Sequence, residues 1–311
     1  MREILSELRR WRERGDGQVA LATVVATRGS APRPVGSKLA VSEEKEIAGS
    51  VSGGCVESEV YEQAQEVLAG GAPRLVSYGI SDEQAWSVGL PCGGEIDVFV
   101  EASPLAELDE LVAALERGER ISIVTALDGD VLLEQEYGPP PRLLVFGAVD
   151  TAEALCKAAK ELGWQTIVAD PRAKFATAER MPSADELLLE WPDEVLARVE
   201  PDDHTAVVVL THEDRFDIPA LAGALRTDAF YVGALGARRN QERRRELLLT
   251  EGLAGDDVDR IAGPAGLDIG AQSTPEVALS ILAEIVASRA GRSGGALKDG
   301  TGRIHAELQR R

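Results

Sequence analysis

The sequence predicts an α/β protein with two domains: an N-terminal mixed α/β domain and a doubly wound, parallel-sheet domain of the Rossmann type. The chain has 311 residues, enough for two domains of ordinary size. The Gly-Pro-Pro-Pro run at 138–141 cannot continue a strand or a helix, so it marks a stiff linker. After this run, apolar strand-like segments alternate with helix-like ones, which indicates a parallel sheet with right-handed crossovers.

These observations divide the chain into a first domain over 1–137, the linker 138–141 and a second domain over 142–290. A tail over 291–311 is rich in glycine and serine, and we expect it to be flexible. In the first domain, the apolar run 19–26 predicts a strand that is buried on both faces. The other expected elements are a helix over 1–14, a helix from 52 to about 69, strands over 38–41, 74–78 and 95–101, and a hairpin of 121–127 with 131–134.

The second domain begins with a buried-type strand, a glycine turn and an amphipathic helix, which together open a βαβ unit. Near its end, Thr274 followed by Pro275 and Glu276 is a helix start signal, with Thr274 as the expected N-cap. The expected elements are strands over 142–147, 166–170, 206–211 and 230–236, and helices over 150–162, 218–225 and 277–288.

Composition restricts the class of protein. Hydrophobic residues make up 44% of the chain and charged residues 28%, which is typical of a soluble globular protein. No apolar run is long enough for a membrane span, and the first residues predict an amphipathic helix rather than a signal peptide. Three cysteines indicate a reducing, cytoplasmic setting. The net charge of −20 argues against a nucleic-acid partner, because phosphate neutralisation needs a basic surface.

Two cysteines lie in glycine-rich turns. Cys55 follows Gly53 and Gly54, where the backbone is expected to leave amide groups free to face a ligand. Ser52 is the expected N-cap of the following helix, and Glu57 suits the positive end of its dipole. We expect the helix start to lower the pKa of the Cys55 thiol.

The second such turn is Pro-Cys-Gly-Gly at 91–94, which contains Cys92 and Gly93. Both cysteines are candidate reactive thiols, and an inert buried role is the alternative. Cys156 lies in the middle of a helix and should be buried and inert. A zinc site is not expected, because the chain has no Cys-x-x-Cys pair and only three histidines.

Basic residues gather in the loop after the first strand, where Arg28, Ser30, Arg33 and Lys38 are candidates for holding a phosphate. A second such turn contains Gly233 and Gly236 followed by Arg238 and Arg239. In both segments, the alternative is that the basic residues lie on a solvated surface and bind no phosphate. A glycine-bounded loop at 266–271, which contains Asp268, is expected to reach the carboxyl edge of the parallel sheet.

The second domain carries an altered dinucleotide fingerprint. Gly147 ends the first strand, and Asp170 follows the second strand, where a ribose-binding carboxylate belongs. The second glycine of the fingerprint is replaced by Val149, and Asp150 adds a negative charge beside it. A β-branched valine is expected to disfavour the backbone conformation that lets a pyrophosphate approach. We therefore expect weakened binding of NAD(P) or of another nucleotide.

Taken together, the motifs resemble those of the XdhC/CoxI family, the xanthine dehydrogenase accessory factors. The resemblance spans about residues 20–290. Its matching pieces are Arg-Gly-Ser-Ala-Pro at 28–32, Gly-Ser-Val-Ser-Gly-Gly-Cys-Val-Glu at 49–57, Pro-Cys-Gly-Gly at 91–94, Thr-His-Glu at 211–213, Tyr-Val-Gly-Ala-Leu-Gly-Ala-Arg-Arg at 231–239 and Gly-Leu-Asp-Ile-Gly-Ala at 266–271. The chain departs from the family at Val149 and Asp150, where members typically have Gly-His.

The resemblance implies a chaperone that binds molybdenum cofactor, assists its sulfuration, protects it and delivers it to a xanthine dehydrogenase-type molybdenum hydroxylase. A cysteine desulfurase is a further candidate partner, and a homodimer is left open. The reactive residues would be Cys55 and Cys92. The cofactor-binding residues would be Arg28, Ser30, Lys38, Gly53, Gly54, Glu57, Gly93, Gly233, Gly236, Arg238, Arg239 and Asp268. An NAD(P)-dependent oxidoreductase and a non-catalytic scaffold are the competing functions.

Overall fold

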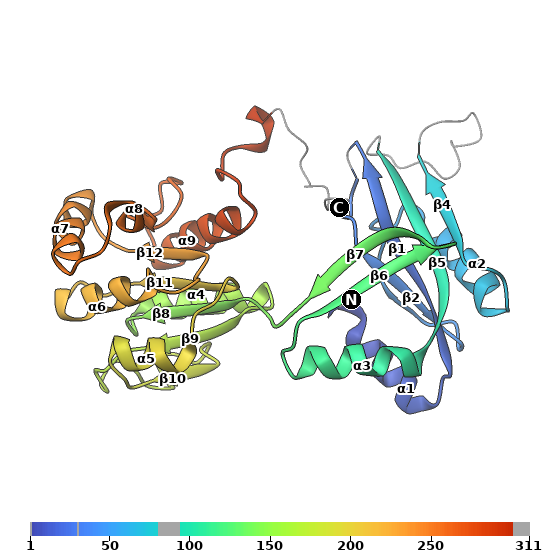
Figure 1. Cartoon of the computed structure of the whole chain (residues 1–311), viewed down its shortest axis with the longest axis horizontal. Helices are drawn as coiled ribbons and strands as arrows, with labels where there is room; N and C mark the ends of the chain where they lie inside the picture. Colours follow the sequence, from blue (N-terminus) through green and yellow to red (C-terminus); the bar gives the residue numbers. More distant parts are fainter. Residues whose placement is uncertain (1, 30, 80–93, 301–311) are drawn as a thin grey trace. The chain divides into compact units, whose positions relative to one another are not determined.

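The computed structural model describes residues 2–29, 31–79 and 94–300. They form two compact units that separate between Pro139 and Pro140. Figure 1 shows a mainly antiparallel sheet in the first unit and a parallel sheet in the second. The predicted α/β class, with a doubly wound second domain, is therefore confirmed.

The first unit is built on a five-stranded antiparallel sheet with the order β3-β2-β1-β5-β4. Its strands are β1 (Gln18–Arg28), β2 (Lys38–Ser42), β3 (Ile47–Gly49), β4 (Arg74–Tyr78) and β5 (Glu95–Pro104). The central strand β1 is buried through most of its length, as its apolar sequence predicts. It runs on to Arg28 because Thr27 and Arg28 still pair with β5.

Each face of this sheet is covered (Figure 1). On one face, helix α2 (Glu57–Leu68) packs its buried side chains Val60, Ala64 and Val67 against β1, β2 and β5. The other face is covered by the segments η1 (Arg2–Ile4), α1 (Leu5–Arg14), α3 (Leu105–Glu116), β6 (Ile121–Leu127) and β7 (Asp130–Tyr137). The predicted hairpin β6–β7 turns at Asp128 and Gly129, both at left-handed φ values, as a two-residue turn requires. Sequence analysis missed β3 and α3.

The second unit contains a six-stranded parallel sheet with the order β10-β9-β8-β11-β12-β13. Its strands are β8 (Arg142–Phe146), β9 (Gln165–Ala169), β10 (Glu186–Leu188), β11 (Thr205–Val209), β12 (Tyr231–Ala234) and β13 (Ile261–Ala262). The chain moves outward from β8 to β10 and then returns to the other side of β8. The switch point of this Rossmann-type order therefore lies between β8 and β11.

Helices cover both faces of the parallel sheet. Helices α4 (Asp150–Glu161) and α9 (Thr274–Arg289) pack on one face, and Cys156 is fully buried there, as predicted. The other face carries α5 (Pro192–Val199), α6 (Asp214–Ala224), α7 (Arg238–Thr250) and α8 (Gly255–Val258), and a short turn η3 (Leu297–Asp299) follows α9.

Two helix starts of the second unit differ from the prediction. The N-cap of α9 is Ser273 rather than Thr274, because Ser273 forms a capping box with Glu276. Helix α6 begins at Asp214, four residues earlier than expected. No helix in the described part of the chain is both long and apolar enough to cross a bilayer.

Candidate functional site

The loop 50–57, called here the Cys55 loop, is organised around the carboxylate of Glu57. Oε1 of Glu57 accepts hydrogen bonds from the amides of Val51 (3.2 Å) and Ser52 (2.9 Å) and from the Ser50 hydroxyl (2.6 Å). Oε2 accepts from the Gly54 amide (2.8 Å) and from the Ser52 hydroxyl. Partial burial alone would raise the pKa of Glu57, but these hydrogen bonds outweigh it and lower the pKa to about 2.

The amides of Gly53, Cys55 and Val56 are also bonded within the Cys55 loop. The Gly53 amide donates to the Ser50 hydroxyl oxygen over 2.9 Å, and the amides of Cys55 and Val56 both donate to the Ser52 hydroxyl oxygen over 2.9 Å. The expectation that free amides here face a ligand is therefore wrong, because the anion that they bind is the chain's own carboxylate. Ser52 is also not the helix N-cap: Val56 occupies that position, and α2 begins at Glu57.

Cys55 itself is partly buried and packs against the core beneath α2. Beside it, Gly53 and Gly54 are exposed and adopt φ values of 74° and 110°, which favour glycine. A side chain added at either glycine would meet no atom of the described residues within 4 Å, so in this part of the structure the outer surface of the loop is open. The other expected cysteine-turn residues, Cys92 and Gly93, lie outside the described residues, as does Ser30. No group of three or more potential metal ligands occurs among the residues that are described.

The expected anion-binding loop does not present free cations. Arg28 is bound to Glu95 (3.1 Å) and Asp97 (2.8 Å), both on β5. Arg33 forms an ion pair with Glu3. Two of the expected cations are thus already neutralised by carboxylates of the same unit.

Lys38 lies in the interior instead of in a loop. Its side chain is buried, its ammonium group donates to the Thr23 hydroxyl over 2.8 Å, and burial lowers its pKa to about 8. Its neighbour Leu39 belongs to the core beneath α2. Because side chains alternate along a strand, Lys38 points to the face opposite α2 and Cys55. The structure therefore does not bring the Lys38 ammonium group to the Cys55 loop, although the Lys38 carbonyl accepts the Ser50 amide over 2.9 Å.

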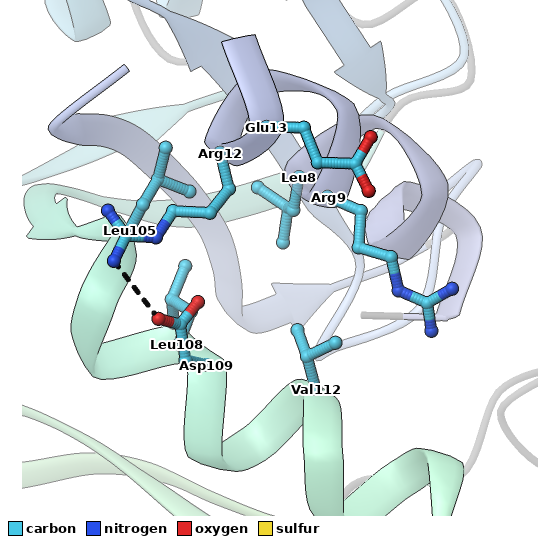
Figure 2. Close-up of a pocket in the computed structure, with 8 residues that line it drawn as sticks. All are labelled: Leu8, Arg9, Arg12, Glu13, Leu105, Leu108, Asp109 and Val112. Atoms are coloured by element: carbon cyan, nitrogen blue, oxygen red, sulfur yellow. Dashed lines mark ion pairs between the residues drawn. The ribbon is translucent and has the colours of Figure 1, made fainter. Parts of the chain in front are cut away.

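A pocket of about 170 Å³ lies between α1 and α3 (Figure 2). Arg12 and Asp109 form an ion pair of 3.2 Å at its wall. The pocket is on the sheet face opposite α2, and its lining contains none of the residues expected from the sequence to form the site. The lining residues are Leu8, Arg9, Arg12, Glu13, Leu105, Leu108, Asp109 and Val112.

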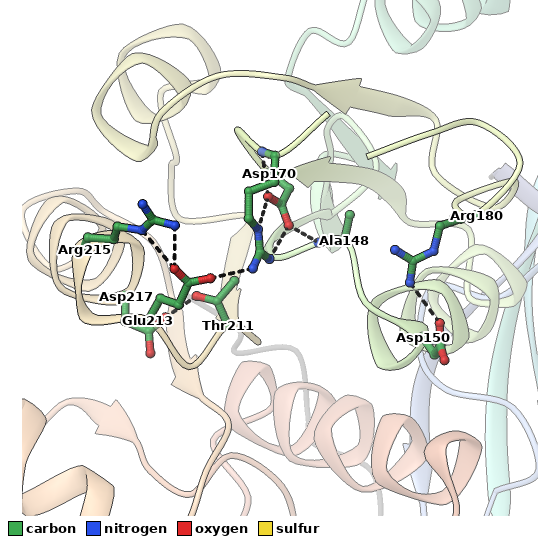
Figure 3. A network of polar contacts seen from close by, with 9 residues as sticks. Ala148, Asp150, Asp170, Arg180, Thr211, Glu213, Arg215 and Asp217 are labelled. Carbon is green, nitrogen blue, oxygen red and sulfur yellow. Dashed lines mark hydrogen bonds and ion pairs between the residues drawn. The ribbon is translucent and has the colours of Figure 1, made fainter. Parts of the chain in front are cut away.

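In the second unit, loops gather at the carboxyl edge of the parallel sheet. The carboxylate of Asp170, which is buried, accepts a hydrogen bond from the Ala148 amide over 3.0 Å. Arg172 donates its guanidinium and its amide to the same carboxylate and forms a 2.7 Å ion pair with Glu213 after β11 (Figure 3). The Arg172–Glu213 pair thus joins the ends of β9 and β11 on either side of β8. The predicted ribose-binding acid is at the expected position, but its oxygens already have internal partners.

The altered fingerprint residues adopt ordinary conformations. Gly147 has a φ of 110°, and a side chain there would meet Thr211 at 2.6 Å. Val149 is extended, with a φ of −112°, a conformation that any residue adopts. That a valine here hinders the approach of a pyrophosphate stays a prediction. The Val149 side chain packs against the core shared by α4 and α9. Asp150 forms an ion pair with Arg180 over 3.3 Å (Figure 3).

A buried polar cluster that sequence analysis missed lies behind this edge. The Thr211 hydroxyl donates to Asp217, and the guanidinium of Arg244 donates to the other oxygen of Asp217 over 2.5 Å. Arg244 also donates to the Leu235 carbonyl over 2.7 Å, so it joins α6, α7 and the turn after β12. Arg244 lies one helical turn before the buried Leu248, so the spacing in the sequence could have identified Arg244 as a residue on the buried side of this helix.

The basic turn after β12 is only partly as expected. Gly233 lies within strand β12, so it is not a turn residue. A side chain at this position would collide with the ring of Tyr231. Gly236 does form the turn, with a φ of 135°. Arg238 and Arg239 are exposed in the first turn of α7 and make no hydrogen bond or ion pair with other described residues. Asp268 is exposed in the loop between β13 and α9.

Comparisons with known proteins cover both units. Residues 11–79 match the model of the XdhC and CoxI family, and residues 143–285 match the model of the XdhC Rossmann domain. A Bacillus subtilis protein, named as a probable subunit of xanthine dehydrogenase, is 26% identical over 88% of this chain and 93% of its own length. An Escherichia coli protein named molybdenum cofactor insertion chaperone PaoD is 29% identical over 88% of this chain and 84% of its own length.

One solved structure is similar to the whole chain. It is described as a xanthine dehydrogenase from Bacillus halodurans and superposes with a TM-score of 0.74 at 25% identity, covering 94% of this chain and 98% of that one. Its fold therefore matches in both units.

Proposed function

The chain belongs to the XdhC and CoxI family, and from this membership we propose that it is an accessory factor that binds molybdenum cofactor and delivers it, in the cytoplasm, to a xanthine dehydrogenase-type molybdenum hydroxylase. The names of two relatives support this role: one is called a molybdenum cofactor insertion chaperone and the other is named as part of a xanthine dehydrogenase. In this role the protein is not a turnover enzyme, and the cofactor is its cargo.

The observation that carries the proposal is the setting of Cys55. Cys55 is partly exposed beside the exposed Gly53 and Gly54, whereas Cys156 is fully buried. Thiolates bind soft metals and can carry sulfur as a persulfide. We propose that Cys55, together with Cys92, protects the metal end of the cofactor and assists its sulfuration. In the sulfur-transfer step, the Cys55 thiolate attacks the outer sulfur of the persulfide of a cysteine desulfurase; the S–S bond of that persulfide breaks, the desulfurase cysteine leaves as a thiolate, and Cys55 becomes the persulfide.

The phosphate of the cofactor needs a different site, because the amides of the Cys55 loop already bind Glu57. We assign it to the turn at Gly236 and to Arg238 and Arg239. These two arginines are exposed at a helix start that has no acidic residue in its first turn, which favours a bound anion.

An NAD(P)-dependent oxidoreductase is the competing function, and the carboxyl edge of the parallel sheet supports it less well. A ribose-binding acid must offer its oxygens to the ribose hydroxyls. The oxygens of Asp170 are instead bonded to Ala148 and Arg172.

The direct test is to purify the protein from cells that make molybdenum cofactor and to detect the fluorescent oxidation product of its pterin. We expect a pterin signal in the unaltered protein and in Cys55→Ala. Only Cys55→Ala should then fail to restore activity to an apo-hydroxylase that requires sulfurated cofactor. Cys156→Ala is the matched control and should behave as the unaltered protein does. Absence of pterin from the unaltered protein, combined with no activation of the apo-hydroxylase, would contradict the proposed function.

The phosphate assignment has its own test. Replacing Arg238 and Arg239 together by glutamine should weaken pterin binding about tenfold or more, because charge-assisted hydrogen bonds contribute roughly 1.5–3 kcal/mol each. Arg226→Gln is the control, because Arg226 is also exposed but precedes β12 at the opposite edge of the sheet. Equal affinities in all three proteins would exclude the assignment.

A further inference from the structure

The exposed tip of the Cys55 loop, at Gly53 and Gly54, is held by polar contacts rather than by packing. Gly53 and Gly54 are exposed, and no atom of the other described residues lies within 4 Å of where their side chains would be. Both residues adopt left-handed conformations that the backbone does not favour for most residues. The loop therefore keeps this shape through its own hydrogen bonds, and most of them end on one carboxylate.

Glu57 fixes the backbone on the N-terminal side of Cys55. Its two oxygens accept the amides of Val51, Ser52 and Gly54, the last of which directly precedes Cys55. These donors converge from residues that are three to six positions earlier in the chain. A carboxylate can accept all of them because it carries two acceptor oxygens and no donor.

Glu57 also fixes Cys55 through a relay. The Ser52 hydroxyl donates its hydrogen to Glu57, and its oxygen accepts the amides of Cys55 and Val56. Because the Ser52 hydroxyl donates its hydrogen to the Glu57 carboxylate, the lone pairs of its oxygen accept the amides of Cys55 and Val56. A glutamine side chain at position 57 would replace one carboxylate oxygen by an NH2 group, which is a hydrogen-bond donor. That group would face the backbone amides or the Ser52 hydroxyl, which are themselves donors.

The helix itself does not require this carboxylate. Glu59 already supplies an acidic residue to the first turn of α2, and the helix is anchored by its buried residues Val60, Ala64 and Val67. The contacts of Glu57 instead run back to the loop.

We propose that Glu57 is the positioning residue of Cys55: through the hydrogen bonds of the Cys55 loop it holds the partly buried Cys55 in the orientation from which this residue acts on the cofactor. The positioning of Cys55 by Glu57 is inferred from the hydrogen-bond network. That Cys55 then acts on the cofactor rests on the proposed function. This inference assigns to Glu57 a role through Cys55 rather than a direct contact with the cofactor, which corrects our expectation that Glu57 binds the cofactor.

The test compares Glu57→Gln with Glu62→Gln. Glu62 is on the same helix and is exposed, and its side chain makes no hydrogen bond or ion pair with the other described residues, so both variants lose one negative charge from α2. We expect amide hydrogen exchange over 51–56 to become roughly tenfold faster or more in Glu57→Gln and to stay unchanged in Glu62→Gln. The alkylation rate of Cys55 should change by about fivefold or more in the first variant only.

A functional readout separates positioning from mere stability. Glu57→Gln should retain its pterin yet activate the apo-hydroxylase poorly, as Cys55→Ala does, and Glu57→Asp should restore part of this activation because it keeps the carboxylate. Unchanged exchange, Cys55 alkylation and activation in Glu57→Gln would overturn the proposal.

Should Glu57→Gln not fold, Ser52→Ala removes the relay hydroxyl and must give the same change at Cys55. Should the unaltered protein carry no pterin, the proposed function fails, and exchange and alkylation alone decide the positioning.

Discussion

The Asp170 carboxylate accepts the amide of Ala148 over 3.0 Å, so the end of β9 is tied to the glycine turn that follows β8. In dinucleotide-binding Rossmann domains, the corresponding acid and turn contact the cofactor. Here they contact each other, and Arg172 occupies the remaining acceptor positions of the carboxylate.

This relationship predicts weak binding of nicotinamide cofactors. We expect NAD(H) and NADP(H) to bind the unaltered protein with a Kd of roughly 0.1 mM or weaker. The double variant Val149→Gly, Asp150→His should gain affinity, by about tenfold or less, because Asp170 stays bound to Arg172. Calorimetric titration of both proteins measures this, and micromolar binding of NAD(H) by the unaltered protein would refute it.

The cysteines should differ in reactivity. Burial raises the pKa of Cys156 to about 12, so this residue is almost entirely a thiol at neutral pH and is also shielded from reagents. We expect Cys55 and Cys92 to be alkylated first and Cys156 last, as followed by peptide mass spectrometry at pH 7.5. In denaturant all three should react at similar rates, which is the control. Faster labelling of Cys156 in the folded protein would contradict the assignment.

Glu57 should affect stability in acid. Its folded pKa of about 2 is below the ordinary value of 4.5, so the folded state binds its proton less readily than the unfolded state does. Its contribution is about 2 kcal/mol once screening by solvent at this half-buried carboxylate is allowed for. That contribution is complete above pH 4.5 and is lost as the pH falls towards 2. Urea unfolding from pH 7 to pH 2.5 should show this loss in the unaltered protein and in Glu62→Gln, but much less in Glu57→Gln.

Lys38 should have the opposite effect on stability. Burial lowers its pKa from 10.5 to about 8, so between these values the unfolded state binds more protons and stability rises with pH. Below pH 8 the buried charge costs about 3 kcal/mol. Lys38→Met should therefore raise the free energy of unfolding at pH 7 by about 1–2 kcal/mol, because the lost bond to Thr23 offsets part of the gain. It should also abolish the rise between pH 8 and 10.5, and the exposed Lys45→Met should do neither.

The buried pair of Asp217 and Arg244 should be essential for the stability of the second unit. Their side chains are only 2% and 6% exposed, so removal of one partner leaves an uncompensated buried charge. We expect Arg244→Met to cost about 3–5 kcal/mol in urea unfolding. Arg243→Met removes the neighbouring arginine, which is 69% exposed and paired with Asp214, and should cost about 0.5 kcal/mol or less. Similar losses in both variants would be contrary to this account.

The architecture could be predicted from the amino-acid sequence. The apolar run of β1 predicted a strand covered on both faces, and the alternation after residue 142 predicted the parallel sheet. The sequence also separated Cys156, on an apolar helix face, from Cys55, in a glycine turn. These features depend on which side chains avoid water, and hydrophobic periodicity records that directly.

The bonding partners of the polar groups became known only from the three-dimensional fold. The glycines and amides around Cys55 indicated an anion-binding loop, but the anion is Glu57. Likewise Asp170 is bonded to Ala148 and Arg172, and Lys38 points away from Cys55 into the opposite side of the sheet. A polar group bonds to whichever partner the fold brings within about 3 Å, and a carboxylate tethered nearby competes with any free ligand. Spacing along the chain does not encode that proximity.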